Sequence, residues 1–401
     1  MYLVAAIVPP GGLFRGREYR DVGLYGDYAR ALLDGRVPYR DFFVEYPPGA
    51  FAVLTPPALL PEDAYRHAFK VLMALLVVAM LMVAALILVR LDVGPRRLYG
   101  TLAVLALSPL ALGPVSLNTY DIWPALLVAA AVCALLYARS TLGFALLGLA
   151  VTAKVYPVAL LPLFCLAARP RLARPLAAFG AVVAVAFVPF AVVGWDGLWE
   201  SLDAQAGRAL QLESLGGAIL AAADRLGVYD ATVVSGSTGA LSRDLEGALP
   251  DAFAVASTLL QAAAILLAAW LYIRRGASAE RLVVASAATL AGFVAFSRFI
   301  SPQYLVWLLP LVPLAGLGAA VLLGAAMVVG RLWFFHYRDV FALEGIVWLV
   351  VLRDALLVAL YGLLLWRTTI PSSSSTLVHS PLSSSRASGT AAVEGEERRS
   401  R

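Results

Sequence analysis

The feature that most constrains this chain is a series of long apolar runs, each close to the length that crosses a lipid bilayer. A spanning α-helix needs about 20 mostly apolar residues, because the hydrocarbon core is about 30 Å thick. The clearest such runs are residues 67–90, 98–115, 121–138, 173–194, 252–273, 281–296 and 346–366. Only 14% of the 401 residues are charged, whereas soluble domains carry about 25%. The sequence therefore predicts an all-α, polytopic integral membrane protein.

Two further apolar runs, residues 141–168 and 302–330, are too long for one comfortable span and short for two. Each has helix breakers near its middle, AKVYP in the first and PLAGLG in the second. The connections RLDVGPRR, ARPRLARP and RRGASAER are strongly basic, and the positive-inside rule places them together in the cytoplasm. For this arrangement, residues 141–168 must cross the membrane twice or form a re-entrant segment. The number of crossings made by residues 302–330 stays open. We expect about 10–12 transmembrane helices in total.

The same orientation predicts that residues 10–66, 195–251 and 297–301 lie on the external face. Within the second of these segments, residues 198–227 mix leucines at helical spacing with charges. This pattern predicts a pair of amphipathic helices that lie in the outer membrane interface.

The predicted organisation is one membrane domain, residues 1–366, followed by a polar tail, residues 367–401. The tail is rich in serine, and we expect it to be disordered and cytoplasmic. The opening run MYLVAAIV is too short to span a bilayer. We interpret it as the end of a first helix whose upstream half is missing.

Composition and motifs exclude several function classes. The net charge is +5, but the basic residues lie between apolar runs and form no patch, so no nucleic-acid partner is expected. Cys133 and Cys165 lie inside apolar runs and the three histidines are scattered, so we expect neither a disulfide nor a metal site built on His and Cys. The sequence contains no P-loop, GxSxG or HExxH pattern. We therefore predict that the protein has no cofactor and that its partners include membrane lipids.

Charged and aromatic residues are dense in the first external segment, YRDVGLYGDYARALLDGRVPYRDFFVEYPPGAF. Apolar residues recur there at steps of three and four, with Asp21 as a helix cap and Gly35 as a stop. This predicts a short amphipathic helix at the outer surface. A plain membrane-surface connector would explain the tyrosines and phenylalanines at headgroup level. It would not explain the clustered acids, which favour a catalytic or binding role.

The pattern D…Y…YA…G…PY.DF..EYPPG, together with KVYP and SPQYLVWLLP, resembles the polyprenyl-phosphate-dependent membrane glycosyltransferases of the GT-C superfamily. The closest resemblance is to glycosyltransferase family 87, a mannosyltransferase-like group. It covers residues 20 to about 366 and leaves out the Ser-rich tail. The first of the three patterns is fairly specific, whereas KVYP alone is weak.

The resemblance implies a GT-C-like helical bundle in the plasma membrane with its active site on the external face. It implies inverting transfer of a hexose, with mannose favoured and arabinose as an alternative, from a polyprenyl-phosphate-linked donor to a lipid or glycan acceptor. In that superfamily an acid in the first external loop is the general base, and by position this residue is Asp21. Dependence on a divalent metal stays open.

The chemistry of such a transfer requires one carboxylate as the base and one cation to bind the phosphate. A carboxylate must take the proton of the acceptor hydroxyl as the new bond to the sugar forms. The lipid phosphate leaves as an anion and needs no acid, whereas a hydrolytic glycosidase needs two carboxylates across the bond.

Each acidic candidate in the external segment also has a structural interpretation. Asp21 is the first choice for the base, with helix capping as the alternative. Asp27 is the second choice, with a solvated helix face as the alternative. Asp41 and Glu45 are candidates for binding sugar hydroxyls, unless they pair within the loop with its arginines.

Cationic candidates for binding the donor phosphate are Lys154, inside an apolar run, and Arg298, at the outer end of a span. The alternative for Lys154 is snorkelling to the outer interface. Tyr156 and Gln303 belong to the motifs KVYP and SPQY, and we include them as substrate-binding candidates together with His336 in WFFHYRD.

Two further polar pairs lie within the predicted spans. Arg353 and Asp354 are adjacent on the last helix, so we expect each to have its partner on another helix as part of a structural network. Asn118 and Asp121 precede a span, where they either cap the helix or line the acceptor groove.

A transporter or lipid flippase would share the spans and the buried charges, and is the alternative function. Such proteins concentrate polar residues near the midplane in broken helices of two related halves. Here the densest acidic and aromatic cluster lies in one unrepeated external segment, which favours the transferase. An inactive structural relative is a third alternative.

Overall fold

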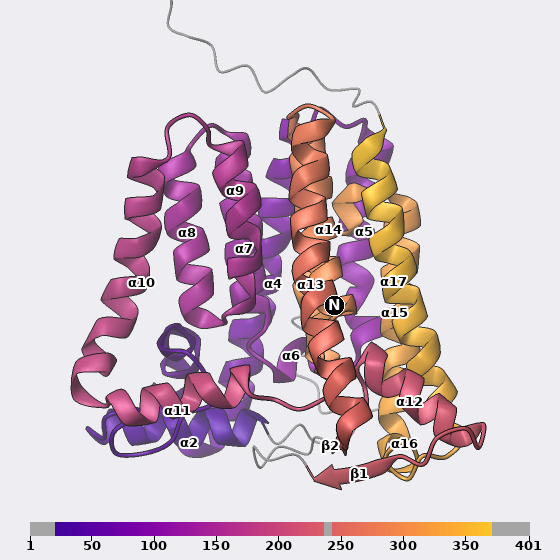
Figure 1. Ribbon diagram of the computed structural model, residues 1–401. Coiled ribbons are helices and arrows are strands. Elements are labelled where there is room, and N and C mark those ends of the chain that lie inside the picture. The colour runs from indigo at the N-terminus through magenta and orange to yellow at the C-terminus, as the bar shows by residue number, and fades with distance from the viewer. Residues whose placement is uncertain (1–20, 236–242, 371–401) are drawn as a thin grey trace, which may run out of the picture.

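The protein, described here by a computed structural model over residues 21–235 and 243–370, is a helical bundle (Figure 1). Five of the described helices are long and apolar enough to cross a membrane. They are α4 (Tyr65–Arg90), α10 (Ala173–Val193), α13 (Ala248–Arg274), α15 (Leu317–Phe335) and α17 (Val347–Thr369). Beside them lie α5 (Pro95–Leu112), α7 (Ile122–Leu136), α8 (Ser140–Ala153), α9 (Leu161–Ala167) and α14 (Ala279–Ala295). The predicted all-α membrane fold is confirmed, and each of the clearest apolar runs forms a helix.

The first ambiguous run, residues 141–168, turns back on itself and forms a hairpin. Helix α8 has 14 residues and is therefore about 21 Å long, which is less than the thickness of the hydrocarbon core. It ends where Lys154 adopts an extended conformation, and the chain returns through the 3-10 helix η5 (Tyr156–Leu160) and α9. The basic connections on either side therefore lie at the same end of the bundle (Figure 1). Lys154, between α8 and η5, lies at the tip of the hairpin.

The second ambiguous run crosses the bundle twice. Residues 302–315 pass through the core as two 3-10 segments, η6 (Pro302–Leu308) and η7 (Pro313–Ala315), and α15 then returns. Gly316, with φ +128°, makes the sharp turn between the two passes. The Arg97 side chain donates a hydrogen bond of 3.0 Å to the carbonyl of Leu314, which ties this turn to the start of α5.

The two ends of the bundle differ in chemistry. All three basic connections lie at the upper end in Figure 1, which we call the basic end, as the predicted topology requires. The opposite end carries short helices, α2 (Asp21–Leu33), α11 (Trp195–Ala206), α12 (Leu215–Arg225) and α16 (Tyr337–Phe341). Helices α11 and α12 confirm the predicted amphipathic pair. The two-stranded sheet of β1 (Thr232–Ser235) and β2 (Arg243–Glu246) at this end was not predicted.

Aromatic packing anchors α2 on the bundle. Tyr25 is buried, and its ring lies 5.5–5.6 Å from the rings of Phe69 on α4, Tyr46 and Tyr120. The helix ends at Leu33, before the predicted stop Gly35, whose φ of +82° favours glycine. Because these rings fix the rotation of α2 about its axis, they also fix the direction in which Asp21 projects.

The chain enters α4 through short turns, η2 (Pro48–Ala50), α3 (Phe51–Leu54), η3 (Pro56–Leu59) and η4 (Glu62–Ala64). A similar turn, α6 (Val115–Asn118), joins α5 to α7. The expected truncation of a first helix and most of the expected disordered tail lie outside the described residues. Helix α17 continues to Thr369, slightly beyond the predicted domain boundary.

One expectation about the last span was wrong. Arg353 and Asp354 are both buried and pair with each other, with 2.8 Å between Arg353 Nη2 and Asp354 Oδ1. The arginine side chain is long enough to fold back along its own helix, so adjacency does not prevent pairing. Arg353 also donates a hydrogen bond to the backbone carbonyl of Glu213, so the pair does take part in a network beyond α17.

Candidate active site

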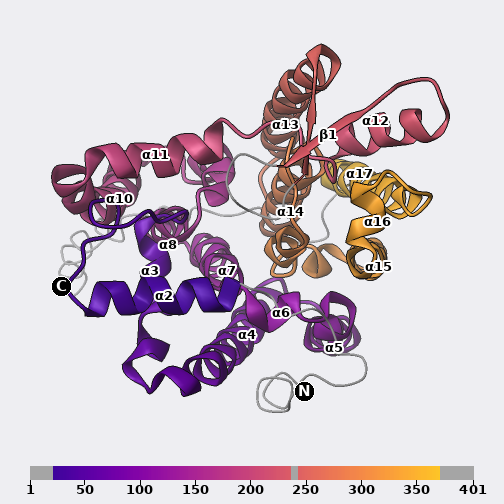
Figure 2. The same ribbon diagram turned by 90° about the horizontal axis from the view of Figure 1, so that it is seen from below.

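A cavity of about 890 Å³ lies at the end of the bundle opposite the basic end. Residues from α2, the loop at 45–47, the tip of the α8–η5 hairpin, α11, η6 and the junction of α15 with α16 all line it. Figure 2 shows this end, with α2 and α11 on one side and α15 and α16 on the other. Its volume lies in the range of sites that hold small molecules.

A buried ion pair stands at one end of this cavity. Lys154 Nζ lies 2.6 Å from Asp121 Oδ1, and the same oxygen accepts a 2.6 Å hydrogen bond from Trp307 Nε1. The Lys154 side chain is 15% exposed and lines the cavity, whereas the Asp121 side chain is 1% exposed. Asp121 stands at the N-cap position of α7, but its side chain makes no capping hydrogen bond and does not line the cavity. It holds Lys154, which lines the cavity.

Aromatic rings surround the ammonium group of Lys154. It lies 4.9 Å from the ring centroid of Tyr120 and 5.3 Å from that of Trp307. The Trp307 ring is stacked between Tyr156 and Tyr304, at centroid distances of 4.0 and 3.8 Å. Cation–π contacts of this kind stabilise a charge that water cannot fully solvate, so the rings and Asp121 together hold the lysine at the hairpin tip.

Asp21 lines the same cavity from the first turn of α2. The pKa of its carboxyl group is raised from 3.8 to about 6, mainly by burial and also by the negative charge of Asp121, while the positive charge of Lys154 lowers it. A carboxylate with this pKa is ionised at neutral pH and is a better proton acceptor than an exposed aspartate.

Glu45 also lines the cavity, and its carboxylate forms an ion pair with Arg208. Its Oε1 lies 2.6 Å from Arg208 Nη2, and Gln205 donates to its backbone carbonyl at 3.3 Å. The Arg208 guanidinium also lies 5.0 Å from the ring centroid of Phe299. This ion pair and the Gln205 contact join the loop between α2 and η2 to α11 and the segment after it, and they form part of the cavity wall.

The other end of the cavity is formed by Glu213, in the segment before α12, and by Trp333, on α15. Glu213 is 6% exposed and Trp333 is 1% exposed. Glu213 Oε2 and Trp333 Nε1 are buried without a hydrogen-bond partner among the described residues. Burial raises the pKa of Glu213 to about 8, so this carboxyl group is mostly protonated at pH 7.

Five of the predicted site residues line the cavity, and four do not. Asp21, Glu45, Lys154, Tyr156 and Gln303 line it.

The remaining four predicted residues lie elsewhere. The Asp27 side chain is 74% exposed and lies 3.5 Å from Arg30. Asp41 pairs with Arg40 in its own loop, as the alternative interpretation anticipated. His336 is half exposed and lies 3.2 Å from Asp339.

Arg298, the last of these four, accepts a 2.9 Å hydrogen bond from Gln211 through its backbone carbonyl. Its side chain is not among the groups that line the cavity.

Sequence reasoning did not place Arg208, Glu213 and Trp333 in the site. These residues come from segments that are distant in sequence, and no local motif marks them. For Glu213 one signal was available, because it is an acid within a leucine-rich amphipathic segment. Within residues 21–235 and 243–370 there is no group of three His, Cys, Asp or Glu side chains that could hold a metal ion.

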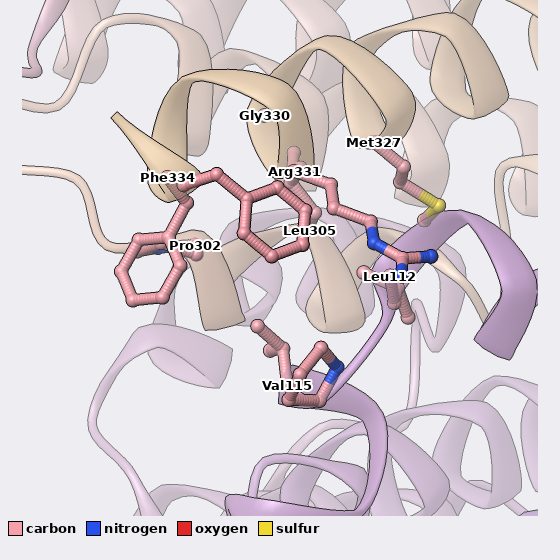
Figure 3. A pocket seen from close by; sticks show the side chains of 10 residues that line it. Leu112, Val115, Pro302, Leu305, Met327, Gly330, Arg331 and Phe334 are labelled. Atoms are coloured by element: carbon pink, nitrogen blue, oxygen red, sulfur yellow. The ribbon is translucent and has the colours of Figure 1, made fainter. Parts of the chain in front are cut away.

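A small apolar side pocket of about 70 Å³ adjoins the cavity and shares Pro302 and Phe334 with it. Figure 3 shows Arg331 and Phe334 of α15 on one side of this pocket and Leu112 and Val115 on the other. Arg331 donates a 2.7 Å hydrogen bond to the backbone carbonyl of Leu110, which joins α15 to α5.

Comparison with models of protein families gives a match over more than half of the chain. The family model described as glycosyltransferase family 87 matches residues 43–302. No curated protein matches the chain. The matched segment includes Glu45, Lys154, Arg208 and Glu213, whereas Asp21 precedes it and Trp333 follows it.

Proposed function

The chain belongs to glycosyltransferase family 87 and is a membrane glycosyltransferase, and from this premise we propose that it transfers a hexose, in the first instance mannose, from a polyprenyl-phosphate-linked donor. The acceptor is the hydroxyl group of a lipid or glycan, and the transfer takes place in the cavity that Asp21 and Lys154 line. The observation that carries the proposal is the presence of this carboxylate and this ammonium group in one cavity of adequate size.

The proposed reaction needs both groups. Asp21 accepts the proton of the acceptor hydroxyl while the acceptor oxygen forms a bond to the anomeric carbon of the sugar. The bond from that carbon to the phosphate oxygen breaks, and its electron pair leaves with the polyprenyl phosphate. Lys154 donates hydrogen bonds to the departing phosphate oxygens, because only one of its three N–H donors is taken by Asp121. Attack from the side opposite the phosphate inverts the anomeric configuration.

Asp21 is preferred to the other acids for a geometric reason. Asp27, the second candidate, is exposed and does not line the cavity. Glu45 does line it, but its carboxylate already forms an ion pair with Arg208.

The proposed orientation places the cavity on the external face of the plasma membrane. The basic connections all lie at the opposite end, and such connections are enriched on the cytoplasmic side. A cavity in this position has access to a lipid-linked sugar in the outer leaflet.

The test is transfer activity of an Asp21→Asn variant in membranes supplied with a polyprenyl-phosphate sugar. Asparagine keeps the shape of the side chain and caps a helix about as well as aspartate, so folding and abundance should be unchanged. Losing a positioned base costs a factor of about 100 or more in rate. Asp27→Asn, on the same helix, is the matched control and should lose little. Near-normal turnover of Asp21→Asn with a dead Asp27→Asn would assign the base to Asp27, and two active variants would place the reaction elsewhere.

A further inference from the structure

The Glu213–Trp333 end of the cavity contains buried polar groups that the proposed phosphate and base chemistry does not use. Glu213 Oε2 and Trp333 Nε1 both lack a hydrogen-bond partner among the described residues, and both residues line the cavity. A buried donor or acceptor without a partner costs about 1–3 kcal/mol. Both residues line the cavity, so an occupant that reaches these two atoms would remove this cost.

The surrounding charges restrict what that occupant can be. The nearest buried cation, Arg353, is already paired with Asp354 and donates to the backbone carbonyl of Glu213. Its guanidinium lies over the Trp333 ring, 5.5 Å from the centroid, and so supports the indole from behind. Arg338 also lines the cavity, but it is exposed. Among the described residues, an anion at the buried Glu213–Trp333 pair would therefore meet a carboxyl group and no uncommitted buried cation, whereas an alcohol could both donate to Glu213 and accept from Trp333.

The rest of the lining fits the same occupant. Phe334, Tyr337 and Phe341 line this part of the cavity from α15 and α16. Sugars present hydroxyl groups along their edges and patches of C–H on their faces, so aromatic walls with a few fixed polar groups are suited to bind them. Because the pKa of Glu213 is high, its carboxyl group carries a proton at neutral pH. It can therefore donate a hydrogen bond to a sugar hydroxyl as well as accept one.

We propose that the Glu213–Trp333 end is a subsite for an uncharged sugar unit of the acceptor, whose hydroxyl groups bond to the Glu213 carboxyl and the Trp333 indole N–H. This inference rests on the proposed function and deepens it, because it divides the cavity between two substrates. The donor phosphate binds at Lys154, and the acceptor is a glycosylated molecule held at the opposite end. The specificity of the enzyme for its acceptor then depends on hydrogen bonds that a bare lipid alcohol cannot make.

The experiment uses binding, so that it is independent of turnover. The full chain is labelled with 5-fluorotryptophan, reconstituted in nanodiscs and followed by ¹⁹F NMR. The chain has eight tryptophans, so the two reporters are assigned from the resonances lost in Trp333→Phe and Trp307→Phe. Trp333 reports on the proposed sugar subsite, and Trp307, next to Lys154 and Asp121, reports on the phosphate end. The probes are n-octyl α-D-mannopyranoside, 1-octanol and a polyprenyl phosphate.

We expect the octyl mannoside to shift the Trp333 resonance in a saturable way and 1-octanol to leave it unchanged. Glu213→Leu, which replaces the carboxyl by an apolar group of similar size, should weaken the octyl mannoside titration at Trp333 by roughly 5- to 10-fold, the worth of one hydrogen bond. It should leave the response of Trp307 to polyprenyl phosphate unchanged.

Different results would overturn the sugar subsite and the proposed polyprenyl-phosphate donor. No response of Trp333 to the mannoside, an equal response to 1-octanol, or a mannoside titration that Glu213→Leu leaves unaltered would each overturn the sugar subsite. If Trp307 does not respond to polyprenyl phosphate while Trp333 responds to the mannoside, the proposed donor is wrong and the sugar subsite stands.

Discussion

The pair of Lys154 and Asp121 allows a sharp test of whether a buried charge serves stability, catalysis or both. We consider Lys154→Met, Asp121→Asn and the double variant. Breaking a buried ion pair by removing one partner costs about 3–5 kcal/mol, while replacing both partners is often close to neutral. The short 2.6 Å contact and the burial of both side chains place this pair in that class.

The structure also predicts an asymmetry between the two single variants. Lys154→Met leaves a carboxylate that is 1% exposed and that keeps only the hydrogen bond from Trp307, so we expect the full cost of about 3–5 kcal/mol. Asp121→Asn leaves an ammonium group that lines the cavity and can turn toward water there, so about 1–3 kcal/mol is expected. The double variant should lie within about 1 kcal/mol of the wild type.

The assay has two readouts. Free energies of unfolding come from SDS titration of the purified protein in mixed micelles, and transfer rates come from the same preparations with a polyprenyl-phosphate sugar. If Lys154 contacts the donor, the double variant regains stability but transfers slowly, with a loss of about 10-fold or more for one charge-assisted hydrogen bond. Activity that returns together with stability would make Lys154 purely structural. Stability changes that add to within about 0.5 kcal/mol would refute the coupling itself.

Three other predictions follow from particular distances and charges. Because the pKa of Asp21 is raised to about 6, acidification should protonate the base early, so kcat/KM should fall about tenfold per pH unit below pH 6, and Asp21→Asn should lack this inflection. A Cβ on Gly49 would lie 2.6 Å from the Thr152 carbonyl carbon, so Gly49→Ala should push the turn that carries Gly49 away from the α8–η5 hairpin and lower stability by about 1–3 kcal/mol in the SDS titration, with an unchanged midpoint as the contrary result. Cysteines at the exposed positions of Arg36 and Arg96 should react with an impermeant thiol reagent in intact cells at 36 and not at 96, and the reverse pattern would refute the proposed orientation.

Much of the membrane fold could be predicted because the bilayer imposes lengths that are visible in the sequence. The basic connections correctly required residues 141–168 to turn back, although the exact break at Lys154 depends on the local chain. The second long run was harder, because 3-10 segments carry no apolar period of the kind that marks an α-helix, and only Gly316 and the prolines indicated the turn. The sheet of β1 and β2 was missed because its strands are short and half-exposed.

Side-chain pairing was less predictable than the helices. Lys154 was correctly identified as a charge that needs an explanation, but its partner Asp121 lies 33 residues away, and the tryptophan that shares that partner lies 186 residues from it. Nothing local relates these positions. The ion pair of Arg353 and Asp354 was predicted wrongly for the opposite reason, since the spacing rule for helices describes where Cβ atoms point and not how far a flexible arginine can reach.

The choice between Asp21 and Asp27 shows most clearly where sequence reasoning ends. Both acids lie on α2, and at 100° per residue they point about 120° apart around the helix axis. The sequence predicts that one of them faces the bundle, but the rotation of α2 decides which. That rotation is set by Tyr25, which packs against Tyr46, Phe69 and Tyr120, rings from three other parts of the chain. With Tyr25 facing inward, Asp21 lies one helical turn away on the same side and reaches the cavity, while Asp27 faces outward beside Arg30. The proposed base is therefore selected by an aromatic cluster, and a change that lets α2 rotate should impair transfer without altering any acid.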